Sequence, residues 1–65
     1  MKKYVVVKVK VDSNMNITSI LDVLFESNSY EKACEMGELY TILFTLKADE
    51  YIGVGSMFKH GICLN

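Results

Sequence analysis

The sequence predicts a small α+β domain, an antiparallel sheet of three to four strands with one short helix, in the order β-β-α-β-β. Three observations support this fold class. The chain opens on alternating valines, a helix start signal stands near residue 28, and alternating apolar residues return after it. The chain has 65 residues, of which 51% are hydrophobic, so we expect residues 1–65 to form one small domain with a thin core.

The first predicted strand covers residues 3–11. One of its sides is an unbroken apolar row of Val5, Val7, Val9 and Val11. The other side reads Tyr4, Val6, Lys8 and Lys10. This alternation is typical of a half-buried strand, and we expect the lysines to face outward and to discourage pairing at a free edge.

A turn follows at residues 12–16, where Asp, Ser and Asn side chains bond to their own backbone. Residues 17–26 then fit two templates. The strand template places on one face Ile17, Leu21, Val23 and Phe25. The helix template places on one face Ile17, Ile20, Leu21, Leu24 and Phe25. We predict a strand, because a short turn favours an antiparallel return and Glu26 would be unfavourable at a helix C-terminus; the alternative fold is β-α-α-β.

The helix is predicted to begin after the sequence Ser27-Asn28-Ser29. Asn28 is the expected N-cap, and Glu31 then takes the third helical position, as in a capping box. The apolar stripe of the helix consists of Tyr30, Ala33, Cys34 and Gly37. Gly37 is the expected end of the helix, because glycine readily takes the left-handed conformation that ends many helices.

Two further strands are expected after the helix. Residues 39–47 alternate again and are apolar on both faces, which indicates a central strand or one that meets a partner. Residues 48–50 are predicted to turn, and residues 51–54 form a fourth strand weakened by Gly53. No structure is assigned after Gly55.

The inventory of reactive side chains argues against an enzyme and against a cofactor or metal site. His60 is the only histidine and is expected at the surface, and Cys34 and Cys63 lack the spacing of metal ligands. We expect Cys34 to be a buried apolar side chain and Cys63 an exposed thiol. Residues 53–56 read Gly-Val-Gly-Ser, but no Gly-Lys-Ser/Thr follows, so a turn or kinked edge strand is preferred over a phosphate loop.

The predicted location is the cytoplasm. Lys8 and Lys10 interrupt the apolar stretch behind the first three residues, so a signal peptide is not expected. No apolar run reaches transmembrane length, and no membrane partner is expected.

Charge is distributed unevenly along the chain and suggests two candidate surfaces. Residues 1–11 carry four lysines, a sum of +4, whereas residues 12–40 carry six acidic residues against one lysine, a sum of −5. The acidic candidates for partner binding are Glu26, Glu31, Glu35 and Glu38. The lysine-rich first strand suggests instead a nucleic-acid or nucleotide site at Tyr4, Lys8 and Lys10, although the net charge of −1 and the absence of arginine disfavour it.

The segment Phe25-Glu26-Ser27-Asn28-Ser29-Tyr30-Glu31-Lys32-Ala33, together with the opening Lys3-Tyr4-Val5-Val6-Val7, resembles the strand-to-helix junction of small phage-encoded proteins. The resemblance implies a non-enzymatic inhibitor or adaptor that binds a host or defence protein, for example one of CRISPR type, in the host cytoplasm. We expect it to act through the acidic residues and through Met57 and Phe58. A homodimer is compatible with either function, because self-association would compensate for a thin core.

Overall fold

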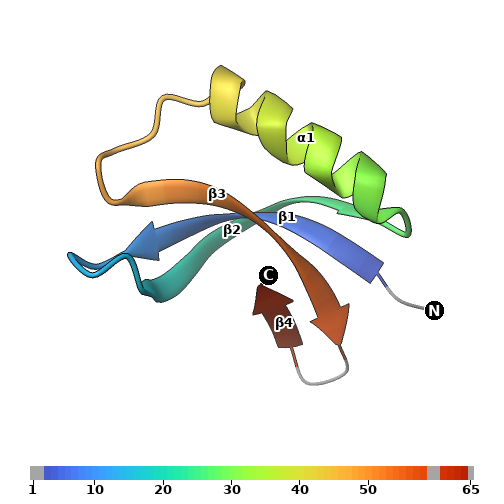
Figure 1. Ribbon diagram of the computed structural model, residues 1–65, viewed down its shortest axis with the longest axis horizontal. Helices are drawn as coiled ribbons and strands as arrows, with labels where there is room; N and C mark the ends of the chain where they lie inside the picture. The colour runs from blue at the N-terminus through green and yellow to red at the C-terminus, as the bar shows by residue number, and fades with distance from the viewer. Residues whose placement is uncertain (1–2, 59–60, 65) are drawn as a thin grey trace.

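The computed structural model describes residues 3–58 and 61–64, and within them one four-stranded antiparallel sheet carries one helix on one of its faces (Figure 1). The elements are β1 (Lys3–Val11), β2 (Ile17–Ser27), α1 (Tyr30–Leu43), β3 (Glu50–Phe58) and β4 (Gly61–Leu64). The strand order across the sheet is β2-β1-β3-β4. The predicted α+β class and β-β-α-β-β order are confirmed, and residues 17–26 lie in a strand rather than in the alternative helix.

Strand β1 is interior to the sheet, with β2 on one side and β3 on the other. Its apolar row is buried as predicted, from Val5 to Val11. Val6, from the other row, is fully buried as well because α1 covers that face. The prediction that this row faces solvent is therefore wrong at Val6, and β1 has no free edge for its lysines to protect.

The turn between β1 and β2 is built by Asp12. Its Oδ1 accepts the N–H groups of Asn14 at 2.9 Å and Asn16 at 3.0 Å, and its own N–H donates to the Asn16 carbonyl at 2.9 Å. Met15 adopts φ 64°, a left-handed conformation that is rare outside turns. These bonds close the turn and return the chain as an antiparallel strand.

Strand β2 contains three shifts of register against β1, after Val6, Lys8 and Lys10. At each shift one residue of β2 lacks a direct partner on β1, as in a β-bulge. The shifts place Ile17, Ile20 and Val23 opposite Val11, Val9 and Val7 respectively. These three residues therefore share one face of β2. The predicted strand face of Ile17, Leu21, Val23 and Phe25 is wrong, because Leu21 lies at a shift and Phe25 is opposite Val6.

Helix α1 begins one residue later and ends six residues later than predicted. Ser29 is the N-cap, and its Oγ accepts the N–H of Lys32 at 3.2 Å, so the assignment of this role to Asn28 is wrong. Gly37 is buried in mid-helix, where an added Cβ would lie 3.0 Å from Cγ2 of Val54. The glycine thus allows the helix to approach the sheet closely and does not end it.

The predicted strand over residues 39–47 is wrong. Residues 39–43 form the last turn and a half of α1, and the helix ends where Phe44 takes an extended conformation while its N–H bonds the Tyr40 carbonyl at 3.0 Å. Tyr40 continues the helical spacing of Ala33 and Gly37, and its hydroxyl donates to the Leu24 carbonyl at 3.3 Å. A loop over residues 44–49 leads to β3.

Strand β3 extends well beyond the predicted residues 51–54, and β4 was not predicted. Of the two structures predicted for residues 53–56, a turn or a kinked edge strand, the structure has a strand, because these residues lie inside β3. Gly55 lies directly against β4, since an added Cβ would stand 2.6 Å from the carbonyl oxygen of Cys63. Met57, Ile62 and Leu64 pack on the buried valine row. Figure 1 shows β4 on the side of the sheet away from α1.

Candidate functional site

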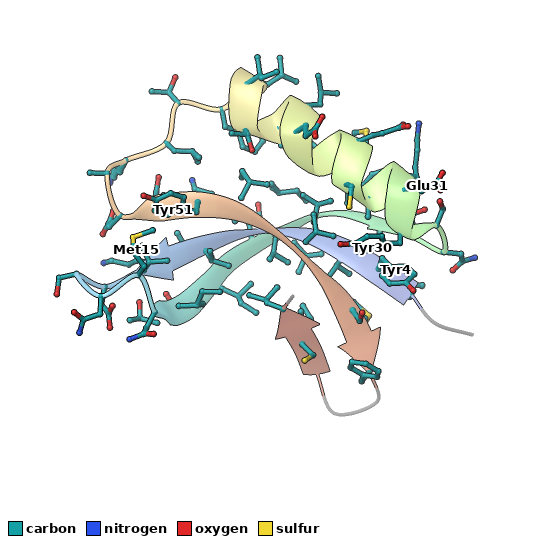
Figure 2. The ribbon with its side chains drawn as sticks, in the orientation of Figure 1. Tyr4, Met15, Tyr30, Glu31 and Tyr51 are labelled. Carbon is teal, nitrogen blue, oxygen red and sulfur yellow. The ribbon has the colours of Figure 1, made fainter. Side chains whose placement is uncertain are left out.

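The outward side of α1 carries three glutamates, Glu31, Glu35 and Glu38, with the exposed Ile42 one turn further on. Spacings of four, three and four residues place these side chains along one side of a helix. Figure 2 shows Glu31 at the first turn of the helix, away from the sheet. Across residues 3–58 and 61–64 the ion pairs involve Glu26, Asp49 and Glu50, so the three helix glutamates stand unpaired.

The last turns of α1 expose apolar side chains. Ile42 is 81% exposed and Leu43 63%, and Leu39 is exposed beside them. Helices that only cover a sheet normally carry polar residues on this side. The outward side of α1 therefore combines an acidic first half with an apolar second half.

The predicted partner-binding residues do not form one surface. Glu26 lies on β2 opposite Val5, on the face away from α1, and its Oε1 is 3.5 Å from Lys3 Nζ. Met57 is packed against the core, whereas Phe58 is 49% exposed at the far end of β3. The structure brings together Glu31, Glu35 and Glu38 and leaves the other three candidates elsewhere.

The lysine-rich strand offers few free groups to a nucleic acid. Lys8 Nζ lies 3.7 Å from Glu50 Oε1, and Lys10 Nζ lies 3.7 Å from Asp49 Oδ2. Tyr4 is half-buried and packs edge-on against Tyr30, with ring centroids 5.3 Å apart, as Figure 2 shows for the labelled pair. The positive charge of this strand is thus largely balanced by residues of β3 and its preceding turn.

A groove runs along α1 on the side of β3, and sequence reasoning missed it. It encloses about 420 Å³. Its lining residues are Tyr30, Cys34, Gly37, Glu38, Thr41, Ile52, Gly53 and Val54. The groove depends on the close approach of α1 to β3, and the two small residues Gly37 and Gly53 were its only signal in the sequence.

In residues 3–58 and 61–64, no group of three or more His, Cys, Asp or Glu side chains could hold a metal ion. Cys63 is an exposed free thiol, as predicted. Cys34 is a free thiol in the groove and is half-buried, whereas the prediction was a buried side chain. His60 and Lys2, one of the four lysines in residues 1–11, lie outside the described residues. No helix in the described ranges has the length and apolar character needed to cross a membrane.

Comparison of the chain with protein-family models, with curated proteins and with solved structures gives no match.

Proposed function

We propose that the protein is a small non-enzymatic interaction protein that binds a positively charged partner protein through the outward side of α1. The observation that carries this proposal is the unpaired stripe of Glu31, Glu35 and Glu38, which continues into the exposed Ile42. Carboxylates without an internal partner attract a basic surface and speed its approach, and an adjacent apolar area adds contact energy.

The partner class follows from this chemistry and from the resemblance to small phage-encoded proteins. A basic host or defence protein, such as a nucleic-acid-binding component of a CRISPR-type system, presents the charge that the helix would meet. Binding there would block or recruit such a protein without any reaction. The nucleic-acid alternative has less support, because Lys8 and Lys10 are paired and Tyr4 is half-buried.

The test compares two variants that make the same change of charge at different places. Glu31→Lys with Glu35→Lys reverses the helix stripe, and Asp22→Lys with Glu26→Lys makes the matched change on β2. The tagged proteins are used to capture partners from a bacterial lysate, with and without nuclease. We expect a stoichiometric basic protein that survives nuclease, is lost with the helix variant and is kept with the β2 variant.

Other outcomes of the same experiment would contradict the proposal. Retention by both variants would show that α1 is not the interface. Loss with both would show dependence on overall charge rather than on contact at the helix. Recovery of nucleic acid alone, abolished by Lys8→Glu with Lys10→Glu, would establish the nucleic-acid alternative.

A further inference from the structure

The first half of β3 has an unpaired edge. Strand β4 pairs only with Gly55–Phe58, so Glu50–Val54 have β1 on one side and no strand on the other among the described residues. The pairing of β1 with β3 continues without a register shift from Lys3 to Lys10. Backbone groups therefore alternate regularly between the two edges of β3.

The direction of these groups is fixed by one hydrogen bond. The Val11 N–H donates to the Asp49 carbonyl at 2.8 Å, so Asp49 points its backbone toward β1. By alternation Tyr51 and Gly53 also point toward β1, and Ile52 and Val54 point their N–H and C=O groups to the open edge. Such a row of backbone groups is a template for an added strand.

The groove of about 420 Å³ lies beside this open edge, between it and α1. Ile52, Gly53 and Val54 form one wall, and helix residues from Tyr30 to Thr41 form the other. The helix rises about 16 Å from Tyr30 to Thr41, which matches the length of about five residues of extended strand. A strand added at Ile52–Val54 would thus direct alternate side chains into the groove.

The charge of the groove selects the occupant. Among the described residues that line the groove, Glu38 alone carries a charge. Glu31 and Glu35 precede it on the same helix. A second copy paired through the same edge would place its own acidic helix on the same face of the joined sheet, next to α1. Like charges would oppose that arrangement, whereas a basic segment would be attracted.

We propose that the groove between α1 and the open edge of β3 binds an extended basic peptide segment, which adds a strand at Ile52 and Val54 and places a Lys or Arg against Glu38. This inference rests on the proposed function and states the form in which the basic partner is held. Backbone hydrogen bonds supply affinity, and Glu38 supplies selectivity.

The probe is the end-capped hexapeptide Lys-Val-Lys-Val-Lys-Val, titrated into the isotope-labelled protein while amide hydrogen exchange is followed. Ile52 and Val54 amides exchange rapidly in the free protein and gain at least about tenfold protection at saturation, because each new hydrogen bond must open before exchange. Two N-methylated forms of the probe, methylated at the odd or at the even residues, keep all of its charges. Only one of these two sets of N–H groups faces β3 in the bound peptide. Methylation of that set prevents binding, and the form methylated at the other set binds like the parent peptide.

A matched pair of variants tests the charge. Glu38→Gln weakens binding of the hexapeptide about twofold to fivefold, and Glu35→Gln, outside the groove lining, weakens it less. Three outcomes would overturn the inference. They are binding without protection of the Ile52 and Val54 amides, equal binding of both methylated forms, and no binding at millimolar peptide. So would protection that rises with protein concentration in the absence of peptide, which would identify a second copy as the occupant. The capture experiment with the helix and β2 variants decides the proposed function separately.

Discussion

Among the four glycines, Gly55 is the one where the structure leaves least room for a side chain. An added Cβ would lie 2.6 Å from the Cys63 carbonyl oxygen and 2.7 Å from Leu64 Cδ2, so β4 would have to move. We expect Gly55→Ala to lower the free energy of unfolding by about 1–3 kcal/mol, as for an overpacked core. Urea denaturation followed by circular dichroism measures this change.

Gly53 provides the control for that substitution in the same strand. Its added Cβ would meet only Val7 Cγ2, at an ordinary 3.9 Å. Gly53→Ala should leave stability unchanged or raise it by about 0.4–1 kcal/mol, because alanine restricts the unfolded chain. Equal effects of the two substitutions would mean that β4 does not press on Gly55.

At the scale of elements, the start of α1 depends on Ser29. Its Oγ accepts the Lys32 N–H, so Ser29→Ala leaves an N-terminal helix donor without its cap. We expect the free energy of unfolding to fall by about 1 kcal/mol, and Asn28→Ala to change it by a few tenths at most. If the asparagine variant proved the more damaging in thermal and urea unfolding, the helix would begin one residue earlier than described.

The elements that the sequence predicts correctly are those with local signals. The valine row of β1 and the Asp12 turn predict the hairpin because their signals are local. Gly37 misled the prediction of the helix end, because its role is contact with Val54 on a strand far along the chain. Strand β4 was not predicted, because Gly53 and Gly55 in the preceding strand lower strand propensity and no structure was assigned after them. In the structure Gly55 allows β4 to pack closely.

The same distinction between local signals and contacts of distant segments applies to the candidate site. Helical spacing is local, so it places Glu31 and Glu35 on one side of the helix. Glu38 joins them only because α1 continues past Gly37, where the helix was expected to end. The position of Glu26 depends on the face of the sheet that α1 covers, and the groove depends on which strand α1 packs against. Both are tertiary properties that no single segment encodes, which is why Glu26 was grouped wrongly and the groove was missed.

At the scale of the whole molecule, ion pairing is uneven over the part of the chain that the structure describes. There the lysines of β1 pair with Glu26, Glu50 and Asp49, whereas Glu31, Glu35 and Glu38 of α1 form no ion pair. We expect association with a basic partner to slow at least about tenfold between 0.05 M and 0.5 M salt, since salt screens this attraction. Stopped-flow mixing at several salt concentrations gives the rate; a rate independent of salt would exclude steering by the helix.

The interior position of β1 also has a consequence for how the protein is made. Strand β1 leaves the ribosome well before its second neighbour, because β3 begins at Glu50, 39 positions after Val11. Until then the hairpin and α1 expose a valine-rich strand edge, the kind of edge that pairs readily with other nascent chains. The sheet can close only once β3 has been synthesised, so chains cut short before residue 50 should be the forms that aggregate or are degraded in the cell.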